Sequence, residues 1–180
     1  QAARRSRHAV ELIGSLQAAA AEPGLEGRLQ AVAWEEALRD LLELQAPELE
    51  RLGAVVTLSV PADVRLVIAE PVALDRVFHG LMSASLKNLE RVPVSERQLE
   101  FTATPLGEWA SLTIRDTGPG WTDDELERLL RPADPLSPGS EGPFSLPVCA
   151  ALAHGMGGSL IAGNGALRGA WFRLSLPVNH

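Results

Sequence analysis

The chain has 180 residues, of which 46% are hydrophobic and 22% charged, and its formal net charge is −7. These values are typical of a folded domain and exclude an intrinsically disordered or collagen-like chain. The acidic balance argues against nucleic-acid binding, which needs a basic surface. The single cysteine, Cys149, excludes an internal disulfide and a cysteine-rich zinc site.

The first part of the chain is predicted to be helical. Apolar residues recur at helical spacing within residues 1–21, and again within residues 34–52. Pro47 lies inside the second pattern and predicts a kink or an early end there. Gly53 follows as a helix-ending residue.

Two short strands and a core helix are predicted next. Residues 54–60 alternate between apolar and polar positions, and residues 65–69 form a second short run of this kind. Pro71 then stands where the first residue of a helix would be, and an apolar stripe of helical period continues through residues 71–89.

A hairpin and a glycine-rich loop follow. Residues 97–104 and 109–115 both alternate, so they predict two antiparallel strands joined by a turn. Residues 116–121 are a turn-rich loop. Thr122 and Glu125 then have the spacing of a capping box at the start of a short acidic helix.

The last part of the chain predicts a loop, a helix and two strands. Residues 131–143 are rich in proline and glycine and predict a loop. A helix is expected over residues 144–154, and strands over residues 159–162 and 170–176. Strands that arrive in pairs between helices favour an α+β fold, a two-layer sandwich with a mixed, mostly antiparallel sheet packed on helices.

Several segments, in this order, carry a family resemblance. Asp116, Gly118 and Gly120 form a D-x-G-x-G pattern directly after a predicted strand. Further matches are a helix resembling an N-box and, near the C-terminus, G-G-x-L and G-A-x-F-x-L-x-L-P patterns; these fall at residues 74–88, 157–160 and 169–177. Together they resemble the GHKL ATPases, the Bergerat-fold family, in the form of a sensor histidine kinase's ATP-binding catalytic domain. The resemblance predicts this domain over residues 30–180, and over residues 1–29 the end of a dimerisation and phosphotransfer hairpin.

The resemblance also predicts a nucleotide site. It implies that Asp116 hydrogen-bonds an adenine amino group, with Gly118 and Gly120 allowing close approach of the backbone. Trp121 would line or plug the same cleft, and Lys87 would meet the phosphates. Two alternatives stay open at this point: Asp116 is a relic that caps a turn, and Lys87 is an exposed surface lysine.

The helix that resembles the N-box keeps the family's apolar positions but lacks its polar side chains. The two positions where the family has asparagines are Gly80 and Ala84. The second asparagine is the family's magnesium ligand, and neither residue here has a side-chain oxygen. His79 and Ser83 are offset by one residue, about 100° around a helix, so they are poor substitutes.

The lid segment departs in the same way. The family's glycine-rich phosphate-binding run falls on residues 141–146, where Glu141 adds negative charge, Pro143 removes a backbone donor and Ser145 replaces a glycine. ATP and magnesium are the cofactors that the resemblance implies, and these changes weigh against both.

Three functions are compatible with this pattern. The first is a pseudokinase-like signalling domain with weak or no ATP binding that acts through a response regulator or a partner histidine kinase. The second is an active histidine kinase with unconventional ligands, and the third is a histidine phosphotransferase with a relic ATPase domain. None of the four histidines precedes an acidic residue, as the family's phospho-acceptor does. A homodimer through the N-terminal helix, a cytoplasmic location and no membrane span in this fragment are further expectations.

Overall fold

The computed structural model describes residues 10–11, 27–130 and 145–179. Within these ranges the helices are α2 (Trp34–Leu44), α3 (Ala46–Leu52), α4 (Pro71–Leu89), α5 (Asp123–Leu130) and α6 (Leu146–Gly155). The strands are β1 (Val10–Glu11), β2 (Gln30–Ala33), β3 (Val55–Ser59), β4 (Leu66–Ala69), β5 (Gln98–Leu106), β6 (Trp109–Asp116), β7 (Ser159–Asn164) and β8 (Ala170–Pro177). None of the described helices combines the length and the apolar character needed to cross a membrane.

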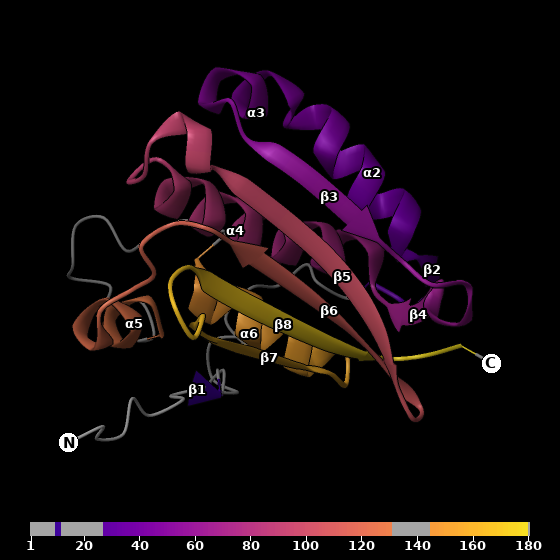
Figure 1. Cartoon of the computed structure of the whole chain (residues 1–180). Helices are drawn as coiled ribbons and strands as arrows, with labels where there is room; N and C mark the ends of the chain where they lie inside the picture. The colour runs from indigo at the N-terminus through magenta and orange to yellow at the C-terminus, as the bar shows by residue number, and fades with distance from the viewer. Residues whose placement is uncertain (1–9, 12–26, 131–144, 180) are drawn as a thin grey trace.

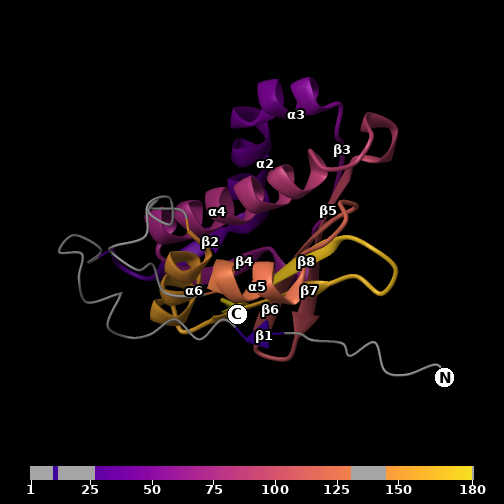
Figure 2. The ribbon, with the colours of Figure 1, turned by 90° about the vertical axis from the view of Figure 1, so that its left-hand side faces the viewer.

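Among the described residues, six strands form the main sheet in the order β1-β7-β8-β6-β5-β3. The pairing of β3 with β5 is parallel and the other four pairings are antiparallel. Strands β2 and β4 form a separate antiparallel pair. Figure 1 shows α4 and α6 on one face of the main sheet, and the side view in Figure 2 shows α4 crossing between α2 and α6. The predicted two-layer α+β sandwich with a mixed, mostly antiparallel sheet is therefore confirmed.

Helix α4 lies at the centre of the fold and begins with strong local signals. Glu70 is its N-cap, and its carboxylate accepts hydrogen bonds from the backbone N–H groups of Val72 (3.1 Å) and Ala73 (2.5 Å). Pro71 occupies the first turn, where its missing N–H has no helical partner to lose. The carboxylate of Glu70 is therefore used to start the helix.

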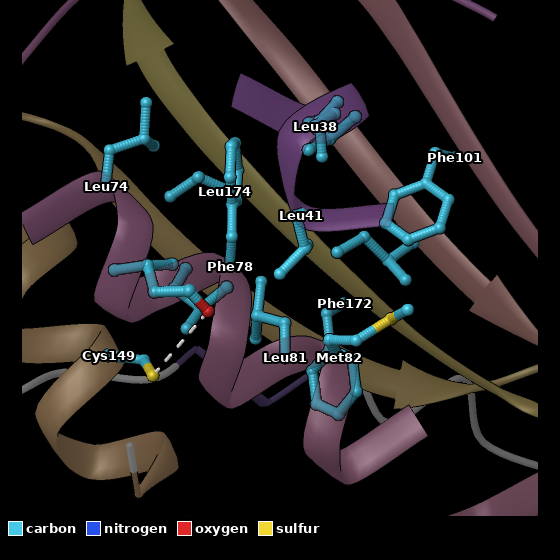
Figure 3. Close-up of a cluster of buried hydrophobic side chains, with 14 of the residues drawn as sticks. Leu38, Leu41, Leu74, Phe78, Leu81, Met82, Phe101, Cys149, Phe172 and Leu174 are labelled. Atoms are coloured by element: carbon cyan, nitrogen blue, oxygen red, sulfur yellow. Dashed lines mark hydrogen bonds between the residues drawn. The ribbon is translucent and has the colours of Figure 1, made fainter. Parts of the chain in front are cut away.

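The core fills the space between α4 and the sheet. The labelled side chains in Figure 3 come from both layers: Leu38 and Leu41 from α2, Leu74, Phe78, Leu81 and Met82 from α4, Phe101 from β5, Cys149 from α6, and Phe172 and Leu174 from β8. All of them are at most 2% exposed. The core therefore joins α4 to α2, to α6 and to strands β5 and β8 of the main sheet.

Most elements predicted from periodicity are present, and two differ. At Val10 and Glu11 the prediction of a helix is wrong, because these residues pair as β1 with β7; the rest of residues 1–21 lies outside the described residues. The short strand β2 was not predicted. The helix over 34–52 is divided at Gln45, two residues before Pro47, in agreement with the kink or early end predicted there.

Candidate functional site

The candidate site forms where β6 ends and the glycine-rich loop begins. Asp116 is the last residue of β6 and is 2% exposed. Its Oδ1 atom accepts hydrogen bonds from the backbone N–H groups of Gly118 (2.9 Å) and Ala170 (3.3 Å) and from Nδ2 of Asn88 (2.5 Å). Its Oδ2 atom is buried and has no hydrogen-bond partner within the part of the chain that the structure describes. The carboxylate therefore keeps one free acceptor inside the protein.

The surroundings of Asp116 also change its acidity. Burial raises the pKa of Asp116 from 3.8 to about 6, although the hydrogen bonds from Gly118, Ala170 and Asn88 lower it in part. Burial dominates because it removes water from the charged form. The carboxylate is still mostly ionised at neutral pH, so Oδ2 is an acceptor there.

The two glycines of the motif lie where no side chain fits. A Cβ atom on Gly118 would lie 2.5 Å from Nδ2 and 2.7 Å from the backbone oxygen of Asn88. Gly120 has a φ of +82°, and a Cβ there would lie 2.8 Å from Oδ1 of Asn164. The loop can therefore run close to α4 and β7 only because both positions are glycine.

Trp121 is fixed by contacts with Asn164 and Arg91. Its backbone N–H donates to Oδ1 of Asn164 (2.9 Å), and Nδ2 of Asn164 donates to the Trp121 carbonyl oxygen (2.7 Å). The guanidinium of Arg91 lies 5.8 Å from the centre of the Trp121 ring and donates to the Gly120 carbonyl oxygen (3.1 Å). The predicted capping box is confirmed directly after it, with Thr122 and Glu125 bonded to each other's backbone N–H. Figure 1 shows α5 beyond this end of the sheet.

The two α4 positions where the resembled family has asparagines offer no ligand for a magnesium ion. Gly80 and Ala84 are both buried and have no side-chain oxygen. His79, beside Gly80, shares a hydrogen bond between Nδ1 and the Asp75 carbonyl oxygen at 2.9 Å. Within the described residues, no group of three or more His, Cys, Asp or Glu side chains could hold a metal ion. Gly80 and Ala84 therefore offer no side-chain oxygen to a magnesium ion.

Lys87 lies on a different side of α4 from Asp116. Its side chain is exposed, and it lines a hollow of about 400 Å³ together with residues of α3 and α4 and residues that directly follow α2 and α4. The other lining residues are Gln45, Glu48, His79, Ser83, Leu86 and Glu90. Asp116, Gly118, Gly120 and Trp121 are thus brought together, whereas Lys87 lies in this separate hollow and its contact with phosphate stays a prediction.

Two buried polar residues of α4 were not singled out from the sequence as site residues. Asn88, which contacts Asp116, and Ser85 are both 0% exposed, and Oδ1 of Asn88 and Oγ of Ser85 have no hydrogen-bond partner among the described residues. A signal was available, because both residues continue the apolar stripe that passes through Leu81. Polar side chains on a buried stripe are typical of functional or specially paired positions.

The lid positions are described only in part. Glu141 and Pro143 lie outside the described residues. Ser145 is the N-cap of α6 but makes no capping hydrogen bond, and its buried Oγ has no partner in the described residues 10–11, 27–130 and 145–179.

The comparisons with known proteins agree with this arrangement. Residues 69–180 match the family described as histidine kinase-, DNA gyrase B-, and HSP90-like ATPase. The chain belongs to this family. The match begins at the end of β4 and includes α4, the Asp116 loop and the closing strands.

Individual relatives are known by sequence and by structure. The C4-dicarboxylate transport sensor protein DctB of Pseudomonas aeruginosa is 29% identical over 147 residues, 81% of this chain and 24% of that protein. The chain thus spans about a quarter of this curated relative's length.

The solved catalytic domain of the histidine kinase ThkA has a TM-score of 0.70 at 14% identity, over 84% of this chain and 96% of that one. Full-length ShkA in complex with AMPPNP has a TM-score of 0.69 at 19% identity, over 91% of this chain and 34% of that one. ThkA has also been solved in complex with the response regulator protein TrrA. The fold of this chain is that of histidine-kinase catalytic domains.

Proposed function

We propose that this domain acts in two-component signalling as a pseudokinase-like module. It binds a purine nucleotide weakly through the base, without magnesium, and it acts by docking to other proteins rather than by transferring phosphate. Its nucleotide contact would be Asp116, with Gly118, Gly120 and Trp121 around it.

The observation that carries the proposal is the pair Gly80 and Ala84 on α4. A magnesium ion in a nucleotide site needs oxygen ligands at close to octahedral positions, and these two residues supply none. The buried free oxygen of Asp116 supports binding of the base. A few hydrogen bonds of about 1 kcal/mol each would give only weak binding, with a Kd on the order of 1–10 mM.

Protein partners are supported by the relatives. DctB is a sensor protein, and ThkA forms a complex with a response regulator. This domain would accordingly bind a response regulator or a partner histidine kinase, in the cytoplasm.

The proposal is tested by titrating the protein with ATP and with ADP. Each titration is done once with magnesium and once with excess EDTA, and binding is measured from NMR chemical shifts. We expect weak saturable binding that changes less than about twofold when magnesium is removed. Asp116→Asn should weaken it by about tenfold, because Oδ2 is replaced by a donor. Asp63→Asn, an exposed matched control, should leave it unchanged.

Two results would contradict the proposal. Binding that tightens more than about tenfold with magnesium, together with phosphoryl transfer from ATP to a histidine, would show an active kinase instead. Chemical shifts that do not change with either nucleotide would show that the site binds none.

A further inference from the structure

One face of the main sheet is left open by the described helices. Figures 1 and 2 show α4 and α6 on one side of the sheet and no described helix over the other side. Side chains alternate between the two faces of a strand. In β6 the buried Leu112 and Ile114 belong to the core between the sheet and the helices. Thr113 and Arg115, which alternate with them, therefore point to the open face.

A tryptophan and two arginines lie together on this open face. Trp171 of β8 is directly opposite Arg115 of β6 in the strand pairing. Two residues further along β8, the guanidinium of Arg173 lies 5.3 Å from the centre of the Trp171 ring, and its Nε donates to Oγ1 of Thr113 (3.3 Å). The indole N–H of Trp171 donates to the Asn164 carbonyl oxygen (3.0 Å). The outer-face cluster is the name used below for Thr113, Arg115, Trp171 and Arg173.

The positive charge of the outer-face cluster is not balanced. Neither Arg115 nor Arg173 forms an ion pair within the part of the chain that the structure describes. Glu100 lies directly opposite Arg115 in β5, but its carboxylate accepts a hydrogen bond from Thr102 (2.8 Å). The cluster is thus a cationic patch on a chain whose net charge is −7. Arginine and tryptophan are also the side chains that contribute most often to protein–protein binding.

We propose that the outer-face cluster docks an acidic segment of a partner protein, whose carboxylates bind the guanidinium groups of Arg115 and Arg173. A guanidinium pairs with a carboxylate through two parallel hydrogen bonds. The Trp171 ring and Thr113 hold the Arg173 side chain in place, which lowers the cost of ordering it on binding. The inference rests on one part of the proposed function, that the domain acts by docking to other proteins, and it names the surface and the chemistry of the partner.

An apolar row on the same face favours a protein over a nucleic acid as the partner. Leu106, Trp109 and Pro177 are cross-strand neighbours in β5, β6 and β8. Leu106 is 60% exposed and Trp109 is 39% exposed. The row lies about 20 Å along β6 from Arg115. A peptide segment can contact both places, with carboxylates at one and an apolar side chain at the other. A nucleic acid carries a phosphate at every nucleotide and is repelled by the acidic protein as a whole.

The probe is a capped peptide of alternating glutamate and leucine, about ten residues long, titrated into the protein and followed by NMR. We expect saturable binding, with the largest shifts at the backbone amides of the outer-face cluster. Raising NaCl from about 50 to about 500 mM should weaken binding by about tenfold. Arg115→Gln combined with Arg173→Gln should weaken it by at least about tenfold. The matched control is Arg39→Gln, at an exposed arginine of α2, which should change it by less than about twofold.

Three results would overturn the inference. They are the absence of saturable binding to wild type, equal weakening by Arg39→Gln, and an oligothymidylate that binds the cluster as tightly as the peptide. If the double variant does not fold, Arg115→Gln alone decides, because Arg115 makes no bond that holds Trp171; it should weaken binding by about threefold or more, and no change would overturn the inference.

The titration with ADP keeps this inference separate from the nucleotide site. A protein that binds ADP and not the acidic peptide would refute the docking surface and leave the site at Asp116 intact. A protein that binds the peptide at the outer-face cluster and not ADP would support the docking surface and refute the nucleotide site alone.

Discussion

The side-chain amide of Asn88 donates a 2.5 Å hydrogen bond to the carboxylate of Asp116, and both residues are buried. The bond joins the last turn of α4 to the end of β6, 28 residues further along the chain. Gly118 makes this contact sterically possible, because any Cβ at that position would overlap the Asn88 amide. The helix and the loop are therefore parts of one site.

Gly118→Ala should break this arrangement. The new methyl group would lie 2.5 Å from Nδ2 of Asn88 and 2.7 Å from its backbone oxygen, so α4 or the loop must shift. We expect a loss of about 2–3 kcal/mol in the free energy of unfolding, measured by denaturant titration.

Gly155→Ala is the matched control for that change. Gly155 is the last residue of α6, and a Cβ there meets no atom within 4 Å. Its replacement should leave stability unchanged or raise it by up to about 1 kcal/mol. A Gly118→Ala protein as stable as Gly155→Ala would contradict the tight packing at Asn88.

Asp116 should make stability depend on pH in a specific direction. Its pKa is raised to about 6 in the folded protein, above the ordinary 3.8, so the folded state binds more protons between these values. Stability should therefore rise as pH falls from about 7 to about 4, by an amount on the order of 3 kcal/mol.

Other groups titrate in the same range, so the comparison is with Asp116→Asn. The difference in unfolding free energy between the two proteins, followed from pH 8 to pH 4, isolates the Asp116 contribution. Parallel curves would show that burial does not raise the pKa of this carboxyl.

The fold could be predicted where local pattern and tertiary pairing agree. Helix α4 has a cap, a proline in its first turn and a continuous apolar stripe, so its bounds follow from the sequence. Val10 and Glu11 show the opposite case, because their helical spacing is overridden by pairing with β7 at the far end of the chain. Strand β2 likewise exists through its pairing with β4 and has no clear alternation of its own.

The site could be predicted only where the motif names it. The D-x-G-x-G pattern led to Asp116, Gly118 and Gly120, which the structure brings together. Asn88 lies within the N-box segment, but its partner Asp116 is distant in sequence. The periodicity of a sequence does not show which two buried polar groups contact each other. The contact between Asn88 and Asp116 could therefore be seen only in the structure.

Asn164→Ala should loosen the Trp121 loop. Asn164 makes two hydrogen bonds to the backbone of Trp121, at 2.9 and 2.7 Å. Losing both should cost about 1–2 kcal/mol and should shift Trp121 fluorescence to longer wavelength as water reaches the ring. Trp121→Phe identifies that emission among the four tryptophans. An unchanged spectrum and stability would show that Arg91 alone holds the loop.

The reactivity of the Cys149 thiol should show when α6 separates from α4. Burial raises the pKa of its thiol to about 12, and Sγ lies 3.9 Å from the Arg76 and Val77 carbonyl oxygens of α4. Because only the exposed thiolate reacts, labelling by a disulfide reagent at pH 8 should follow unfolding. Its rate should rise with denaturant in step with the loss of circular dichroism. Complete labelling of the native protein within the mixing time would show that α6 separates from α4 while the sheet stays folded.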